Sequence, residues 1–243
     1  MPGKALEGQV ALVTGGAKRI GRSIALRLAA DGAAIAVNYA TSKNEAESLV
    51  REIRAGGAKA IAIQADVSKR AEVEEMTAAV ERELGRLDIL VNNAGTFFRA
   101  KFEDLTDEQW DRIMDANLKS QFLCSQLAAP IMKRQGRGRI INISSLGGLF
   151  PWPSYTHYCV SKAGSLMLMR CLARALAPEI LVNSVAPGTI QFPGEPPDEE
   201  YIRRVPLHRT GTGDDIAGAV AYLATADFVT GQVIVVDGGR TLV

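Results

Sequence analysis

The stretch that decides the fold lies near the start of the chain and reads Val10-Ala11-Leu12-Val13-Thr14-Gly15-Gly16-Ala17-Lys18-Arg19-Ile20-Gly21. Its first four residues are apolar and predict a short buried strand, and Ile20, Ile24 and Leu28 recur at helical spacing. The glycine-rich turn between them follows a strand and opens a helix. Free backbone N–H groups and the helix dipole favour a diphosphate at such a place. The stretch therefore predicts the first strand and helix of a dinucleotide-binding unit.

The same alternation of strand and helix continues along the chain. Short apolar runs predict further strands at 33–39, 60–65, 88–91, 139–144, 180–185 and 232–236. Helical periodicity predicts helices at 45–55, 73–84, 107–134, 155–177 and 214–224. Alternating strands and helices form βαβ units, in which helices cover both faces of a parallel sheet. The expected fold is α/β, with a Rossmann-type doubly wound parallel sheet of about seven strands. No linker divides the chain, so residues 1–243 are expected to form a single domain.

Composition excludes several classes of function. The 243 residues carry a net charge of +1, so no general affinity for nucleic acid or membrane is expected. No apolar run reaches the length of a membrane span, and the first residues do not resemble a signal peptide. The three scattered cysteines, Cys124, Cys159 and Cys171, suit a reducing compartment, and a cytoplasmic location is expected. His157 and His208 belong to no cluster with ligand spacing, so packing or surface roles are expected and no catalytic metal.

The end of the second predicted strand indicates the cofactor type. An NAD site usually has an acidic residue about 20 positions after the glycines, where it holds the ribose 2′-hydroxyl. Residues 38–44 read Asn-Tyr-Ala-Thr-Ser-Lys-Asn, and the first acid, Glu45, already lies in the helix. Cationic and hydroxyl side chains that can meet a 2′-phosphate lie close by, namely Lys18, Arg19, Thr41, Ser42 and Lys43. The sequence therefore favours NADPH over NADH.

Over its whole length, the chain resembles the short-chain dehydrogenase/reductase family. The resemblance is carried by Thr14–Gly21, Asp66-Val67, Asn92–Gly95, Asn117, Ser145, Tyr158-x-x-x-Lys162, Pro187-Gly188 and Val236–Gly239. It implies a nicotinamide cofactor, a small-molecule substrate and a homotetramer or dimer. With the turn and strand arguments above, it indicates a cofactor site made of Gly15, Lys18, Arg19, Ile20, Gly21, Asn38, Tyr39, Thr41, Ser42, Asp66, Val67, Asn93, Ala94, Gly95, Tyr158, Lys162, Pro187, Gly188 and Ile190.

One departure from the family pattern bears on the substrate. The usual turn has glycine where this chain has Arg19, and the arginine form is similar to that of pteridine reductases. Phe97 matches a phenylalanine that stacks on a flat pterin in that branch. Pteridine reductases, however, commonly carry Asp in place of Ser145 and Ser in place of Gly95. The stretch Val37-Asn38-Tyr39 resembles 3-oxoacyl-carrier-protein reductases instead, so both substrate classes remain open.

The predicted catalytic group centres on Tyr158 and Lys162, which lie four residues apart and share a helix face. A tyrosine has a pKa of about 10 and is a poor acid–base group at neutral pH without a positive neighbour. Lys162 supplies that charge and can also hydrogen-bond the ribose. Tyr158 is the expected proton donor to a carbonyl or C=N group, and hydride transfer belongs to the cofactor.

A serine and an asparagine complete the predicted group. Ser144 and Ser145 both follow the fifth strand, but successive strand residues point to opposite faces, so only one reaches the site. The family's thirteen-residue separation from Tyr158 selects Ser145, which can donate a hydrogen bond as charge develops on the substrate oxygen. By the family pattern, Asn117 would hold a water that relays protons towards Lys162. A purely structural interior amide is the competing interpretation of Asn117.

Aromatic and apolar residues near the predicted catalytic edge suggest the lining of a substrate pocket, namely Phe97, Leu146, Trp152 and Phe192. Phe150 lies with them, and both Phe150 and Trp152 fit either the pocket or a subunit interface. The proline-rich loop from Pro187 to Asp198 is expected to be a semi-rigid flap that leaves the pocket open. Since fold alone does not establish function, an NADP-binding sensor is the alternative to an enzyme.

Overall fold

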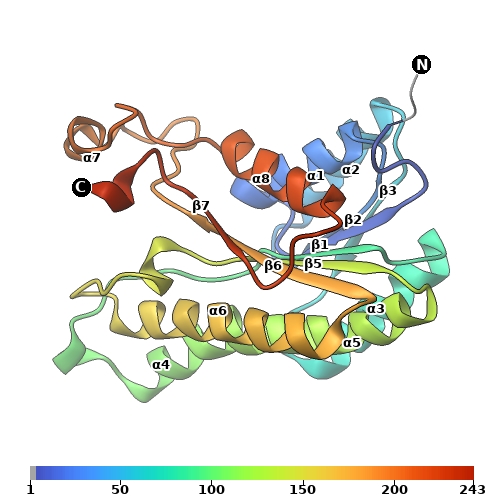
Figure 1. Ribbon diagram of the computed structural model, residues 1–243, viewed down its shortest axis with the longest axis horizontal. Helices are drawn as coiled ribbons and strands as arrows, with labels where there is room; N and C mark the ends of the chain where they lie inside the picture. The colour runs from blue at the N-terminus through green and yellow to red at the C-terminus, as the bar shows by residue number, and fades with distance from the viewer. Residues whose placement is uncertain (1–3) are drawn as a thin grey trace.

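The computed structural model describes residues 4–243, which form one parallel sheet with helices on both faces (Figure 1). The strands are β1 Val10–Val13, β2 Ala34–Tyr39, β3 Ala60–Gln64, β4 Ile89–Asn92, β5 Gly138–Ile143, β6 Ile180–Pro187 and β7 Val233–Val236. They lie in the order β3-β2-β1-β4-β5-β6-β7, and every neighbouring pair is parallel. The predicted doubly wound fold is confirmed.

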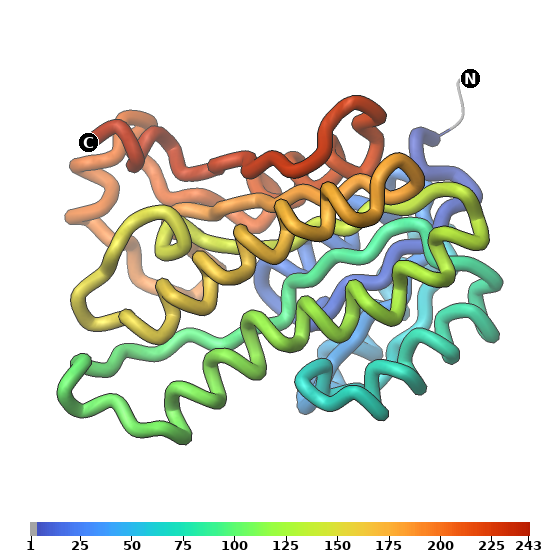
Figure 2. The backbone as a smooth tube through the Cα atoms, turned by 60° about the horizontal axis from the view of Figure 1, so that its bottom comes forward, coloured from blue at the N-terminus to red at the C-terminus, as the bar shows by residue number. Residues whose placement is uncertain are grey.

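The helices form two layers, one on each side of the sheet. They are α1 Arg19–Ala30, α2 Lys43–Ala55, α3 Arg70–Leu84, α4 Asp107–Met114, α5 Ser120–Arg134, α6 Thr156–Leu176, α7 Glu199–Arg204 and α8 Gly213–Thr225. Helices α1, α2 and α8 share one buried apolar cluster with the sheet, whereas α3, α5 and α6 share the cluster on the opposite face. Figure 2 shows α3, α5 and α6 side by side across that second face.

The chain order places the functional site. Strands β2 and β3 extend to one side of β1, while β4 to β7 extend to the other, so the winding direction reverses between β1 and β4. In open α/β sheets, ligands bind outside the carboxyl ends of the strands at this reversal. The glycine turn follows β1 at this point, and its Thr14 accepts hydrogen bonds from Asn93 N and Ala94 N after β4, both at 3.0 Å.

The structure differs from the predicted elements in two segments. The helix expected at 107–134 is interrupted by a π-helical turn, Asp115–Lys119, between α4 and α5. Apolar periodicity does not register such a single wide turn, which often marks a functional position in a helix. The short helix α7 was not predicted, because its six residues are too few for a periodic pattern. None of the helices in residues 4–243 has the length and apolar character needed to cross a membrane.

Candidate active site

The glycine turn after β1 depends on two glycines. Gly15 has a φ of +57°, in the left-handed region that glycine adopts readily. A Cβ atom on Gly21 would lie 2.4 Å from the Gly15 carbonyl oxygen and 2.6 Å from Nδ2 of Asn93. That side chain in turn donates to Thr14 O at 2.9 Å and Gly15 O at 3.0 Å. The turn is therefore closely packed against the end of β4 and leaves the amino end of α1 facing the cleft.

The first half of the cleft is a cavity of about 490 Å³ beside the ends of β2 and β3. Fully buried Asn38 braces it, because its Oδ1 accepts from Gly15 N at 3.1 Å and its Nδ2 donates to Ala65 O at 3.0 Å. The remaining predicted residues of this region line the cavity, namely Lys18, Tyr39, Thr41, Ser42, Asp66 and Val67. Lys18 forms an ion pair with Glu45 at 2.7 Å. Thr41 and Ser42 therefore follow β2 where an NAD site has its acid, and Lys18 lines the same cavity.

The second half is a cavity of about 510 Å³ that shares Gly15, Lys18, Ala94 and Gly95 with the first. Its lining includes the predicted nicotinamide side of the site and the catalytic group: Arg19, Ile20, Gly21, Asn93, Ser145, Tyr158, Lys162, Pro187, Gly188 and Ile190. Two cavities that meet at the glycine turn match the shape of a dinucleotide with its diphosphate at that turn. The residues present therefore fit a dinucleotide cofactor.

Tyr158 and Lys162 lie on the first turns of α6 and face the second cavity. Lys162 is buried, and its Nζ donates to the Ile143 carbonyl at 2.9 Å. Burial lowers the pKa of Lys162 to about 8. Burial also raises the pKa of Tyr158 to about 12, and a hydrogen bond with Ser145 opposes this shift. Tyr158 is consequently held in its protonated, donor form. Nζ of Lys162 lies 5.7 Å from the Tyr158 ring centroid.

The two serines after β5 have different partners. Ser144 Oγ donates to Val185 O at 3.0 Å, so its proton is used within the sheet. Ser145 Oγ accepts from Gly147 N at 3.1 Å, which leaves its own proton for a partner in the cavity. Both serines line the second cavity, contrary to the expectation that only one reaches it, and the choice of Ser145 over Ser144 stays a prediction.

Asn117 lies in the π-helical turn and is completely buried. Its Oδ1 accepts from Thr96 N at 2.7 Å, and its Nδ2 donates to Thr96 O at 3.0 Å and to Ser161 Oγ at 3.1 Å. These bonds join the loop after β4 to α6, so Asn117 supports the helix that carries Tyr158. A Cβ on Gly95 would lie 2.9 Å from Asn117 Oδ1 and 3.9 Å from Lys162 Nζ.

Aromatic side chains surround Tyr158. Trp152 stacks on it with ring centroids 6.1 Å apart, and Phe97 meets it edge-on at 4.7 Å. Phe97 also stacks in parallel on Tyr155, at 4.7 Å and 5°. Tyr155 was not predicted as part of this group, although it lies only three residues before Tyr158, at the N-cap of α6. Phe192 lines the same cavity and lies against Arg19, whose guanidinium carbon is 4.2 Å from the ring centroid.

A third cavity of about 450 Å³ adjoins the second and shares Trp152, Gly188 and Thr189 with it. Leu146 and Phe150 line this third cavity rather than the catalytic one. Of the two residues with an open assignment, Trp152 therefore lines both cavities, while Phe150 lines only the outer one and is 45% exposed.

The histidines stand apart from the chemistry. His157 is buried and its ring centroid lies 4.5 Å from that of Phe98, whereas His208 lies on the surface. Within residues 4–243, no group of three or more His, Cys, Asp or Glu side chains is arranged to hold a metal ion.

The protein has a doubly wound sheet, a dinucleotide-shaped cleft and a Ser-Tyr-Lys group at the carboxyl edge of that sheet. These features are typical of nicotinamide-dependent oxidoreductases. A family model described as enoyl-(acyl carrier protein) reductase matches residues 15–241. The chain is 44% identical over 237 residues to 3-oxoacyl-[acyl-carrier-protein] reductase FabG from Staphylococcus epidermidis, covering 94% of this chain and 97% of that protein. An uncharacterized oxidoreductase from Methylorubrum extorquens is 43% identical over 246 residues, or 96% and 98% of the two chains.

Solved structures are also similar to this chain. A blue fluorescent protein from a metagenomic library, in complex with NADPH, is 40% identical with a TM-score of 0.89, covering 97% of this chain and 99% of that one. A dehydrogenase/reductase from Sinorhizobium meliloti is 38% identical with a TM-score of 0.91, covering 97% and 96%. The chain belongs to the short-chain dehydrogenase/reductase family, as its sequence motifs predicted.

Proposed function

We propose that the protein is an NADPH-dependent reductase that uses Tyr158 to protonate a carbonyl substrate. The observation that carries the proposal is that Ser145, Tyr158 and Lys162 line one cavity together with the glycine turn. The similar structure in complex with NADPH and the relatives named as reductases support the choice of cofactor and reaction. So does the first half of the cleft, where Lys18, Thr41 and Ser42 stand in place of an acid.

The residues of the cavity divide the work of the reaction. NADPH, when bound, supplies the hydride. Ser145 donates a hydrogen bond to the substrate oxygen, and Tyr158 delivers a proton to the same atom. Lys162 places an ammonium beside the tyrosine and stabilises the phenolate that remains. Pro187 and Gly188 line the same cavity, where they would flank the nicotinamide.

We propose 3-oxoacyl thioesters as the first substrate class. Two relatives that are 44% and 39% identical are named 3-oxoacyl-[acyl-carrier-protein] reductases. Gly95 also favours this class over pterins. The serine of pteridine reductases would bring a Cβ within 2.9 Å of Asn117 Oδ1. The neighbouring third cavity, lined by Leu146 and Phe150, offers apolar space for an acyl chain.

A dihydropterin is the second candidate, and one observation favours it. Phe97 is 56% exposed while one face of its ring stacks on Tyr155, so the ring presents surface to a flat substrate. The test is NADPH consumption with 3-oxoacyl thioesters, dihydropterins, quinones and simple ketones. Turnover of thioesters alone supports the first class, and turnover of dihydropterins alone supports the second. Tight NADPH binding without turnover of any compound would instead indicate a sensor.

We also propose that the protein works as a homotetramer, with a dimer as the alternative, in the cytoplasm. Large apolar side chains are exposed on α5 and α6, including Phe122, Val160 and Met167. Exposed apolar patches of this kind commonly mark subunit interfaces. Light scattering during size-exclusion chromatography measures the mass in solution, and a monomer at micromolar concentration would contradict this proposal.

A further inference from the structure

Both cations of the glycine turn are already paired with carboxylates from other parts of the chain. Lys18 Nζ lies 2.7 Å from Glu45 at the start of α2. Arg19 Nη1 lies 2.6 Å from Glu195 in the flap, a residue 176 positions away in the sequence. In both pairs, a carboxylate forms an ion pair with a cation that lines the cofactor cleft. Since phosphate and carboxylate seek the same cations, each pair competes with a ligand phosphate.

Arg19 is held by more than the ion pair. Its backbone φ is +53°, a left-handed conformation that is uncommon for a residue with a side chain. The guanidinium lies over the Phe192 ring, and the same Glu195 carboxylate accepts the Phe192 N–H at 3.1 Å. The tip of the flap thus encloses the guanidinium between an aromatic face and a carboxylate. The Arg19 side chain itself is 61% exposed, so a ligand in the cleft can reach it.

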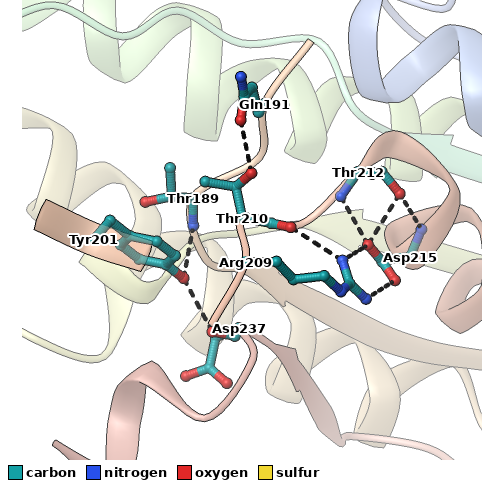
Figure 3. Close-up of polar contacts among 8 residues, drawn as sticks. All are labelled: Thr189, Gln191, Tyr201, Arg209, Thr210, Thr212, Asp215 and Asp237. Atoms are coloured by element: carbon teal, nitrogen blue, oxygen red, sulfur yellow. Dashed lines mark hydrogen bonds and ion pairs between the residues drawn. The ribbon is translucent and has the colours of Figure 1, made fainter. Parts of the chain in front are cut away.

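The base of the flap is fixed, which keeps Glu195 in place. Figure 3 shows the polar contacts that anchor it to α8 and to the end of β7. Thr210 Oγ1 donates to Gln191 Oε1 at 2.9 Å, and the neighbouring Arg209 forms two bonds with Asp215 at 2.7 and 2.8 Å. Gln191 Nε2 then donates to the backbone oxygen of Glu195 at 3.0 Å. The carboxylate is therefore carried by an anchored segment and not by a freely moving loop.

The two pairs face different parts of a dinucleotide. Arg19 lines only the catalytic half of the cleft, at the amino end of α1, where a diphosphate is expected. Lys18 lines both halves, and its partner Glu45 lies beside the half that lacks an acid for the ribose. The diphosphate is common to NADPH and NADH, whereas the 2′-phosphate occurs only in NADPH. The pairs should consequently influence the two cofactors differently.

We infer that Glu195 is a positioning residue whose ion pair with Arg19 competes with the cofactor's diphosphate and thereby weakens its binding. This inference rests on the proposed function, because it takes the cleft as a nicotinamide dinucleotide site. Glu45 provides an internal comparison, since Lys18 also lines the half of the cleft beside β2 and β3, and the effect of Glu45 should therefore be larger for NADPH than for NADH.

The test compares Glu195→Gln and Glu45→Gln by calorimetric titration with NADPH and with NADH, in the absence of substrate. Glutamine keeps the size and the accepting oxygen of Glu195 but removes its charge. Exposed ion pairs contribute little, so we expect Glu195→Gln to lower the Kd of both cofactors by roughly two- to fivefold. Glu45→Gln should lower the Kd of NADPH by a similar factor and that of NADH by less.

Hydrogen exchange on the ligand-free proteins supplies a second measurement. Loss of the charge should speed exchange of the backbone amides at 191–195 in Glu195→Gln and not in Glu45→Gln. A Kd that is unchanged or higher for Glu195→Gln, or lower for NADPH alone, would overturn the inference. If the unaltered protein binds neither cofactor, it is the proposed function that fails. Normal binding with no effect of the substitution rejects only the role of Glu195.

Discussion

The catalytic corner and the flap form opposite walls of one cleft, and they are built in different ways. Ser145, Lys162 and the supporting Asn117 are buried, and each forms a hydrogen bond with the backbone. In the flap, Glu195 meets Arg19 through side chains that are 38% and 61% exposed. Removing the partner of a buried polar group costs the protein much stability, whereas breaking an exposed ion pair costs little. The corner is therefore suited to fixed chemistry and the flap to adjustable binding.

This contrast predicts how substitutions on the two walls will differ. Changes in the corner should act on turnover by orders of magnitude, whereas changes at the flap should act on affinity by small factors. Changes in the glycine turn that joins the walls should act on both stability and binding.

The largest effect is expected for Tyr158→Phe, which removes the proton donor and keeps the ring packed against Trp152 and Phe97. General acid catalysis typically contributes about 10²- to 10⁴-fold, so kcat should fall by roughly that amount. The Kd for NADPH should change little, which titration of the variant can establish. Turnover that stays within a factor of about three of the original would remove Tyr158 from its proposed role.

Gly21→Ala is expected to damage the turn that joins the two walls. Its new Cβ would lie 2.4 Å from the Gly15 carbonyl oxygen, so α1 must shift away from the turn. Overpacking of this kind typically costs about 1–3 kcal/mol of the free energy of unfolding, and NADPH affinity should fall as well. Chemical denaturation measures the first quantity. Gly218→Ala in α8 is the matched control, because a Cβ there meets no atom within 4 Å.

The sequence predicted the fold well because the signals were local and repeated. Each buried strand is a short apolar run, and the strand boundaries agree with the structure within about two residues. In the glycine turn, the left-handed position of Gly15 and the crowded position of Gly21 are both marked by glycine in the sequence, whereas the left-handed position of Arg19 is not. The π-helical turn at Asp115–Lys119 was not predicted, because a single wide turn changes the apolar periodicity too little to be detected.

The residues that the motifs single out lie together in the structure, but their contacts could not be predicted from the sequence. Every cofactor residue expected from the motifs lines one of the two halves of the cleft. The pair between Arg19 and Glu195 joins positions 176 residues apart, and no spacing rule connects them. The direction of the pKa shift of Tyr158 could not be predicted either, because it depends on burial, which a motif does not specify.

Lys162 should give the corner a measurable pH dependence. Its pKa is lowered to about 8 from its ordinary value of 10.5, so the unfolded chain binds more protons than the folded one between these values. Stability attributable to this group must then rise as pH increases from about 8 towards 10. Relative to Lys162→Met, which has no charge to bury, the original protein should gain stability over that range in thermal denaturation. A difference independent of pH would mean that the ammonium is solvated in the folded state.

The smallest expected effect concerns the backbone of Arg19, where the flap wall meets the turn. Its φ of +53° costs a residue with a Cβ about 1–2 kcal/mol, and glycine avoids this cost. Arg19→Gly and Arg19→Ala both lose the Glu195 pair, so the difference between them isolates the backbone. Arg19→Gly should therefore exceed Arg19→Ala in free energy of unfolding by roughly 1 kcal/mol. Equal stabilities would show that the turn relaxes to another conformation without the ion pair. The pair would then be what maintains the left-handed backbone at Arg19.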